Sequence, residues 1–294
     1  MAEQHGEREL ERFDADWLAL REPVDHASRS ERLEELLLRH LPAPGAPLRV
    51  VDLGAGAGST LRHLAPRLAA AGHARQEWTL ADHDEALLRR ALAGPRPDGT
   101  TPDGQRVRVD AVAARLDLGD ADALAAVLRP AGRPADVVVA SALLDVLTPA
   151  AAAVLTGALG ALDPRPPVLL ALTVTGSARL DPPADGDDAV AAAFDADQRR
   201  HGLGPDATGH VAGLLAAGGW RVHREPSPWR LGPATRPLLE AWLDGWLAPA
   251  RAGGAGPDGD RDWDDWRGSR LADPGLRARV GHEDLLALPA RPPA

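Results

Sequence analysis

The chain has 294 residues, of which 44% are hydrophobic, so it contains enough apolar material to bury a substantial core. Its formal net charge of −10 argues against nucleic acid as a partner, because such proteins normally need a basic face to contact several phosphates. Cysteine is absent, which excludes disulfides, thiolate metal sites and cysteine nucleophiles. The stretch from Met1 to Trp17 is charged, and no later apolar run approaches the roughly 20 residues of a membrane span. We therefore expect a cytoplasmic protein that does not bind a membrane.

The residues before the first strand are predicted to be helical. Residues 8–41 fit a helical pattern, in which Ser28 or Ser30 offers an N-cap to a stripe of leucines spaced three and four residues apart. The sequence PAPGAP then ends the helix and leads into a strand.

Strand and helix patterns alternate over the next part of the chain. The expected strands are 48–53, 77–81, 107–116, 135–144 and 167–174. The expected helices between them are 59–71, 84–92, 122–128 and 150–162. This alternation predicts an open parallel sheet that is covered by helices on both faces.

The alternation stops after Val174. Helices are expected at 189–200 and 207–217, followed by two short strand-like runs around Pro226 that suggest a hairpin or a bent pair at the sheet edge. The next helix carries Trp242 and Trp246 on one apolar face, which we interpret as core or docking surface rather than a ligand cage. A flexible loop, a last helix near 261–271 and a tail are expected to complete the chain.

A glycine-rich turn joins the first strand to the helix that follows it. The segment from Val50 to Thr60 reads VVDLGAGAGST, with glycines at alternate positions. A turn without side chains lets a ligand lie directly on backbone amides, at the sheet edge where open parallel sheets bind ligands. A dinucleotide fingerprint would need glycine where Ser59 stands. The preceding acid, Asp52, suits a cationic amine better than a pyrophosphate.

With these residues the chain resembles the class I S-adenosylmethionine-dependent methyltransferases, from about Val50 to Trp229. The resemblance implies an α/β, Rossmann-like, doubly wound and mostly parallel seven-stranded sheet, with an N-terminal helical lid and a C-terminal helical extension. It suggests a lid over 1–45, a cofactor-binding catalytic domain over 46–232, and an extension and tail over 233–294. The implied cofactor is S-adenosyl-L-methionine.

The same resemblance assigns contacts to the cofactor. Asp52 would serve its ammonium group and Asp82, at the end of the second strand, its ribose hydroxyls. Each acid taken alone fits a helix cap or a solvated loop better. Four acids at the ends of successive strands, Asp52, Asp82, Asp117 and Asp145, together favour a cofactor site. The full set of expected cofactor contacts is Asp52, Gly54, Gly56, Gly58, Asp82, His83, Asp117, Leu118 and Ser141.

Methyl transfer mainly requires that the acceptor is aligned with the methyl group and, where needed, that a proton is removed. Asp145, which follows the fourth strand, is the best-placed candidate base, and His201 is the second. His210 is a weaker candidate because it fits an ordinary helix position. The first helix is expected to line the acceptor site with Trp17, Arg21 and His26, and Arg21 or Arg29 is a candidate partner for a carboxylate.

Several subclasses are disfavoured. The D/N-P-P-Y/F motif of base-amino methyltransferases is absent from the fourth strand, and the DPPA at 181–184 lacks the aromatic residue. Lysine is absent, which disfavours the metal-dependent catechol-type subgroup, and no residue pattern suggests a metal. We therefore favour O- or N-methylation of a small-molecule acceptor, in a chain that could form a homodimer. A methyltransferase acting on tRNA, rRNA or protein, and a non-catalytic relative that binds the cofactor or a partner chain, remain alternatives.

Overall fold

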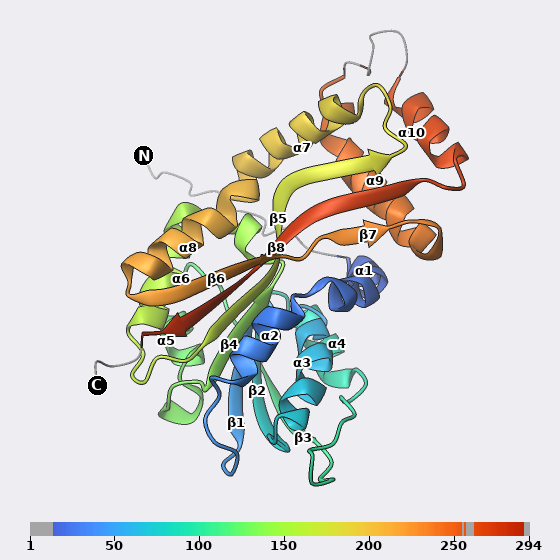
Figure 1. Ribbon diagram of the computed structural model, residues 1–294. Coiled ribbons are helices and arrows are strands. Elements are labelled where there is room, and N and C mark those ends of the chain that lie inside the picture. The colour runs from blue at the N-terminus through green and yellow to red at the C-terminus, as the bar shows by residue number, and fades with distance from the viewer. Residues whose placement is uncertain (1–13, 255, 257–261, 291–294) are drawn as a thin grey trace, which may run out of the picture.

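The computed structural model describes residues 14–254, 256 and 262–290, which form one mixed sheet with helices on both faces (Figure 1). The strands are β1 (Leu48–Leu53), β2 (Arg75–Asp82), β3 (Arg108–Arg115), β4 (Val137–Ser141), β5 (Val168–Asp181), β6 (Trp220–Pro226), β7 (Trp229–Leu231) and β8 (Arg277–Pro289). The helices are α1 (Ala15–Ser28), α2 (Glu31–Leu38), α3 (Ser59–Ala70), α4 (Glu85–Ala93), α5 (Ala121–Val127), α6 (Pro149–Gly160), α7 (Asp187–His201), α8 (Ala207–Ala217), α9 (Arg236–Ala252) and α10 (Trp263–Ala272).

The strand order in the sheet is β3-β2-β1-β4-β5-β8-β6, and β7 pairs with β8 outside this path. Strands β1 to β5 are parallel neighbours, whereas β8 is antiparallel to β5, β6 and β7. The order reverses between β1 and β4, and an open α/β sheet binds its ligand at such a switch point. The predicted α/β, mostly parallel, doubly wound fold is confirmed, with eight strands rather than seven.

Strand β8 corrects the expectation for the end of the chain. The sequence pattern suggested only helix and tail after residue 233, but residues 277–289 form a strand between β5 and β6. Its second half is buried on both faces, from Leu285 to Leu288. The partners of β8 in the sheet are β5 and β6, which are distant from it in the sequence. Local sequence patterns therefore did not reveal this strand.

Of the two expected forms of the region around Pro226, the structure has the pair of strands at the sheet edge and not the hairpin. Strands β6 and β7 do not form a hairpin with each other; both pair antiparallel with β8. They therefore run in the same direction along one edge of β8, and the residues Ser227 and Pro228 separate them. Ser227 donates its backbone N–H to the carbonyl of His282 on β8, so the connection stays attached to that strand.

Two apolar layers cover the central strands. One layer joins α5, α6 and α8 to one face of the sheet, and the other joins α2, α3 and α4 to the opposite face. Val137, Val138 and Val139 of β4 are fully buried, because β4 lies in the middle of the sheet and both of its faces are covered.

A third apolar cluster lies beyond the carboxyl ends of the central strands. The second half of β5, the first half of β8 and β7 extend past the rest of the sheet and are packed against α7, α9 and α10 (Figure 1). Trp242 and Trp246 of α9 are buried in this cluster, as expected of an apolar helix face. They also line a cavity, which is described below.

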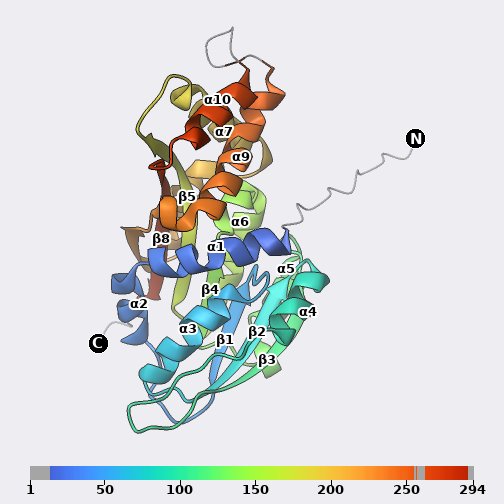
Figure 2. The same cartoon turned by 90° about the vertical axis from the view of Figure 1, so that its right-hand side faces the viewer.

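Helix α1 lies across the carboxyl ends of the central strands, between the sheet and the third cluster (Figure 2). Its N-cap is Asp14, whose side chain accepts a hydrogen bond from the N–H of Asp16. Helix α2 instead packs on the sheet through Leu33 and Leu37. The expected helical region 8–41 thus contains two helices with different positions, and α1 is the one that faces the switch point.

Candidate active site

The glycine turn after β1 has the backbone conformation that its sequence suggests. Gly54, Gly56 and Gly58 have φ values of +65°, +49° and +84°, in the left-handed region that residues with a Cβ rarely adopt. Gly58 is also the N-cap of α3, and it offers no side chain to cap the first amides of this helix. Glycine therefore permits the turn. It also leaves the first backbone N–H groups of α3 without a side-chain cap, so that a ligand can accept hydrogen bonds from them.

Asp82, at the carboxyl end of β2, holds the turn in place. Its Oδ2 accepts the N–H of Gly56 at 2.8 Å and its Oδ1 accepts the N–H of Asp84 at 2.9 Å. The side chain is buried, so these charge-assisted hydrogen bonds offset much of the cost of its desolvation. A carboxylate can accept about four hydrogen bonds, which leaves two for a ligand.

Asp52 and Arg29 are both buried beside the turn. Burial raises the pKa of Asp52 to about 8, while the charge of Arg29 lowers it and that of Asp82 raises it. Both carboxylate oxygens of Asp52, and Nε and Nη1 of Arg29, have no hydrogen-bond partner among the described residues. Arg29 uses its Nη2 to bind Oγ1 of Thr60 at 3.1 Å. Buried polar atoms without partners are uncommon in native proteins, so these four indicate a polar ligand.

Helix α1 is attached to the turn by polar side chains. Arg62 of α3 donates from Nε to Glu22 at 2.7 Å and from Nη1 to the carbonyl of Ala57 at 2.8 Å. Burial lowers the pKa of His26, whose Nε2 lies 3.0 Å from Oγ of Ser59. His26 therefore contacts α3 and does not line the pocket described below.

Two leucines lie against the glycine turn. A Cβ placed on Gly54 would lie 2.9 Å from Cδ1 of Leu143, and one on Gly56 would lie 3.5 Å from Cδ1 of Leu18. Leu18 belongs to α1, so a ligand that lies on the turn must displace this side chain or move the helix. The turn is thus a covered site rather than an open ledge.

The other expected cofactor contacts lie along the same edge of the sheet. His83 is half-buried, with Nδ1 at 3.3 Å from Oδ1 of Asp82 and Nε2 without a partner in the described part of the chain. Asp117 is exposed after β3, and its Oδ1 accepts the N–H of Gly119 at 2.8 Å. Leu118 and Ser141 are half-buried.

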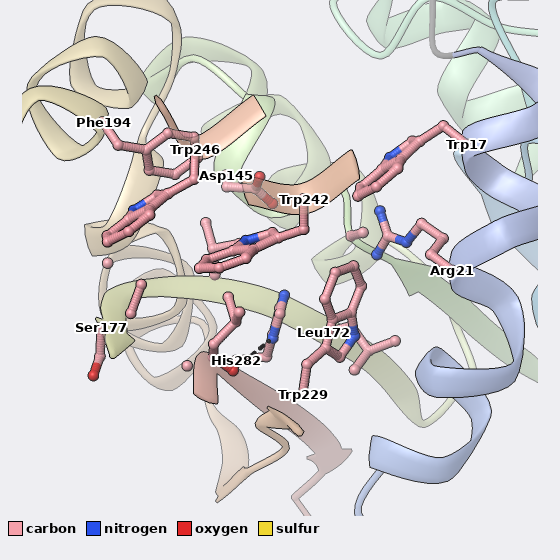
Figure 3. A pocket seen from close by; sticks show the side chains of 16 residues that line it. Trp17, Arg21, Asp145, Leu172, Ser177, Phe194, Trp229, Trp242, Trp246 and His282 are labelled. Carbon is pink, nitrogen blue, oxygen red and sulfur yellow. Dashed lines mark hydrogen bonds between the residues drawn. The ribbon is translucent and has the colours of Figure 1, made fainter. Parts of the chain in front are cut away.

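A cavity of about 140 Å³ lies between α1, α9 and the extended parts of β5 and β8 (Figure 3). We call it the aromatic pocket, because five of its lining side chains are aromatic rings other than histidine: Trp17, Phe194, Trp229, Trp242 and Trp246. Its polar lining comes mainly from Arg21, Asp145 and His282. Ala142, which follows β4, also lines it, so the pocket reaches the switch point.

Arg21 and Trp229 are oriented by one carboxylate. Asp25 accepts hydrogen bonds from Nε of Arg21 at 2.8 Å and from Nε1 of Trp229 at 2.9 Å. The guanidinium carbon of Arg21 lies 4.9 Å from the centre of the Trp229 ring, which is a cation–π contact. Figure 3 shows Arg21 between Trp17 and Trp229 at the α1 side of the pocket.

His282, on β8, presents a neutral imidazole to the pocket. Its Nδ1 lies 3.2 Å from the carbonyl of Val280 and donates a hydrogen bond to it, which leaves Nε2 as the acceptor. Burial and the charge of Arg21 lower the pKa of His282 to about 3. Figure 3 shows the free edge of the ring pointing into the pocket between Trp229 and Trp242.

The two candidate bases from the sequence lie in different places. Asp145, in the turn Leu144–Val146, lines the aromatic pocket. His201, at the end of α7, is exposed and does not line this pocket; its Nδ1 lies 3.0 Å from the carbonyl of Asp197. His210, the weaker candidate, is exposed on α8. Trp17 and Arg21 line the pocket as expected of the first helix.

No local pattern in the sequence indicated that His282, Trp229 or Asp25 is a functional residue. His282 lies on the strand that the prediction omitted, and the centre of its ring lies 4.8 Å from that of Trp229 on β7. A histidine between Gly281 and Glu283 looks like an ordinary surface residue until the strand is known to be buried.

The backbone at the pocket wall is held by a second buried carboxylate. Leu172 of β5 has a φ of +57°, at an irregularity in the pairing of β5 with β8. Asp284 accepts hydrogen bonds from the N–H of Leu172 at 2.8 Å, the N–H of Ser30 at 2.8 Å and Oγ of Ser227 at 2.6 Å. It thereby joins β5, the start of α2 and the β6–β7 connection behind the pocket. Burial raises the pKa of this carboxyl.

Within the described residues, no group of three or more histidine, aspartate or glutamate side chains is arranged to hold a metal ion. Over the same parts of the chain, no helix is both long and apolar enough to cross a membrane.

No protein-family model matches the chain, and no curated protein matches it. Its fold is similar to that of several solved methyltransferases. A phosphoethanolamine N-methyltransferase 2 of Haemonchus contortus, solved with phosphomonomethylethanolamine and S-adenosylhomocysteine, is 13% identical, with a TM-score of 0.44 over 93% of this chain and 57% of that chain. A methyltransferase from Thiobacillus denitrificans, solved with S-adenosylhomocysteine, is 13% identical, with a TM-score of 0.43 over 95% of this chain and 100% of that one.

An arsenic(III) methyltransferase of Chlamydomonas reinhardtii is 15% identical, with a TM-score of 0.40 over 88% of this chain and 74% of that chain. The chain spans 57%, 53% and 50% of the length of three of the structures it matches. With a strand order that reverses between β1 and β4 and a glycine turn at that point, the chain has a Rossmann-like, doubly wound α/β fold.

Proposed function

We propose that the chain binds S-adenosyl-L-methionine at the glycine turn and transfers its methyl group to a small molecule in the aromatic pocket. The observation that carries this proposal is the set of unpartnered polar atoms on Asp52 and Arg29 beside the turn. A carboxyl group and a guanidinium, both buried and each with two hydrogen-bonding atoms that lack a partner, fit the ammonium and carboxylate of an amino acid. S-adenosylmethionine carries such a group on a nucleoside.

The residues present fit the rest of this ligand. Asp82 has acceptor capacity left for ribose hydroxyls after it binds Gly56 and Asp84. His83 and Asp117 lie along the same edge of the sheet, where they could contact the adenine of the cofactor. When bound, S-adenosylmethionine supplies a methyl group that its sulfonium has already activated, so the protein mainly has to bind and align the two reactants.

The position of the aromatic pocket supports a small acceptor. It adjoins the switch point through Ala142 and is covered by α1, which also covers the glycine turn through Leu18. A volume of about 140 Å³ has room for one small ring and not for a folded RNA or a protein surface. Leu18 would have to move for the cofactor to bind, so we expect α1 to act as the lid.

Isothermal titration calorimetry with S-adenosylmethionine tests the proposal. We expect binding by the wild-type chain, and at least about tenfold weaker binding after Asp82→Ala, since a carboxylate that accepts hydrogen bonds from hydroxyls contributes roughly 1.5 kcal/mol or more. Asp110→Ala is the matched control, because Asp110 is an exposed acid on the neighbouring strand β3. Absence of binding by the wild-type chain would refute the proposed function, and binding without methylation of any small molecule would identify a non-catalytic relative.

A further inference from the structure

The aromatic pocket is narrow enough to restrict its ligand to one ring. Its volume of about 140 Å³ is close to the roughly 150 Å³ of an engineered apolar cavity that binds benzene. Trp17, Trp229, Trp242 and Trp246 supply flat faces, and rings prefer to stack on or meet such faces edge to face. A planar six-membered ring fits this space better than a branched or linear ligand of the same size.

The polar lining of the pocket indicates what the ring carries. His282 offers a hydrogen-bond acceptor at Nε2, because its Nδ1 is engaged with Val280. Arg21 lies nearby with its Nε and Nη2 bound to Asp25, and it contributes to a positive potential at the imidazole. A hydroxyl group matches both side chains. It can donate a hydrogen bond to Nε2 of His282, and its oxygen gains negative charge near Arg21 as the proton leaves.

We propose that the aromatic pocket binds a single-ring phenol or hydroxylated heteroaromatic as the methyl acceptor, and that Nε2 of His282 receives the proton of its hydroxyl group. This rests on the proposed methyltransferase function and names the acceptor class for it. Asp145 and the aromatic walls would also suit a small amine. Arg21 disfavours a second cation beside His282, so the hydroxyl is the better match.

The hydroxyl O–H bond breaks and its proton goes to Nε2 of His282, while an oxygen lone pair forms the bond to the methyl carbon. The electron pair of the broken S–C bond remains on the sulfur of the donor, and the imidazolium later releases its proton to solvent. The oxygen becomes strongly acidic as it gains the methyl group, so a weakly basic imidazole suffices.

Binding is tested first, without turnover. Phenol, cyclohexanol and benzylamine are titrated into the wild-type chain, and binding is followed by quenching of tryptophan fluorescence in the pocket. We expect phenol to bind at least about tenfold more tightly than cyclohexanol or benzylamine, and its addition to shift the nitrogen NMR signal of Nε2 in His282. Preference for benzylamine would overturn the hydroxyl assignment in favour of an amine acceptor.

Turnover is tested with His282→Gln, which keeps a hydrogen-bonding group near Nε2 but cannot take a proton. Phenol binding should change less than about threefold, while methylation of phenol with a labelled donor should fall by about a hundredfold or more. For a fluorinated phenol that is already ionised at the assay pH, the methylation rate of the variant should fall by less than about fivefold. A loss of equal size for both phenols would show a merely structural role for His282.

His40→Gln is the control, because His40 is exposed just after α2 and does not line the pocket. If the wild-type chain binds S-adenosylmethionine but none of the ring compounds, this inference is wrong and the proposed function stands. If it does not bind S-adenosylmethionine, the proposed function itself fails. Should His282→Gln not fold, the binding preferences and the NMR shift of the wild-type chain still decide the matter.

Discussion

The indole Nε1 of Trp229 donates a hydrogen bond of 2.9 Å to Oδ1 of Asp25, across 204 positions of the sequence. The same carboxylate binds Nε of Arg21 at 2.8 Å, so one side chain of α1 orients both an aromatic wall and the cation of the pocket. This contact attaches the N-terminal helix to β7. The aromatic pocket is therefore built jointly from residues near the beginning and the end of the chain.

Asp25→Ala should destabilise the protein by about 3 kcal/mol or more, because it leaves the buried guanidinium of Arg21 unpaired. Urea unfolding measures this loss. Glu35→Ala is the control, since Glu35 pairs with Arg39 at 3.6 Å on the surface and should contribute less than about 0.5 kcal/mol. Equal losses in the two variants would contradict the assignment of Asp25 as the anchor of α1.

The pKa of Asp52, about 8, predicts that binding of S-adenosylmethionine depends on pH. At pH 7 the free carboxyl is mostly protonated, and an ammonium group beside it would lower its pKa and release a proton. The affinity should thus rise with pH up to about 8 and then level off. Calorimetry in two buffers of different ionisation enthalpy measures the released proton, and Asp52→Asn should abolish the release. A pH-independent affinity would show that Asp52 does not meet a cation.

The same pKa predicts the effect of Asp52 on stability. The folded value lies above the unfolded value, so the neutral carboxyl favours folding below about pH 4 and this contribution is lost as pH rises through about 8. Asp52→Asn should therefore stabilise the ligand-free protein by about 2 kcal/mol or more at pH 9 and change little near pH 4. Urea unfolding at the two pH values checks this, and a constant difference would refute it.

Gly58→Ala should destabilise the glycine turn more than its backbone angle alone requires. Gly58 and Gly104 both have a φ of +84°, but a Cβ on Gly58 would lie 3.1 Å from Cβ of Ala91, whereas a Cβ on Gly104 would meet nothing within 4 Å. We expect a loss of about 1 kcal/mol for Gly104→Ala and about 2 kcal/mol or more for Gly58→Ala. Thermal unfolding compares them, and a matching loss in both would exclude the packing effect.

Asp284→Ala should loosen the wall of the aromatic pocket. It removes the acceptor for the buried N–H of Leu172, the buried hydroxyl of Ser227 and the half-buried N–H of Ser30. Leaving such donors unsatisfied costs about 1 to 3 kcal/mol each, so we expect a loss of about 3 kcal/mol or more. Urea unfolding followed by tryptophan fluorescence measures it, and a loss below about 1 kcal/mol would show that the three donors find other partners.

Local patterns in the sequence were sufficient for the central part of the fold. The expected strand 48–53 is β1 and the expected helix 207–217 is α8, because each has a clear apolar period bounded by glycine, proline or a capping residue. The glycine turn was also predictable, since alternating glycines between a buried strand and a helix require the positive φ values that the structure has. These features depend on neighbours within a few residues.

The aromatic pocket and β8 depend on contacts between distant segments. The helix with Trp242 and Trp246 was recognised as apolar, but nothing in its sequence shows that it shares a cavity with Trp17 of α1 and His282 of β8. The pairing of β8 with β5 joins positions more than a hundred residues apart, such as Val168 with Ala287. Only tertiary packing decides whether such residues meet.

By itself, the sequence determined the alternating strands and helices, the glycine turn and the acids at the strand ends. The backbone preferences and hydrophobic periods of nearby residues encode these features. The tertiary structure decided that α1 covers the glycine turn, that β8 joins the sheet, and that the neutral imidazole of His282 faces the aromatic pocket. Those outcomes arise from burial and hydrogen bonding between segments that are remote in the chain.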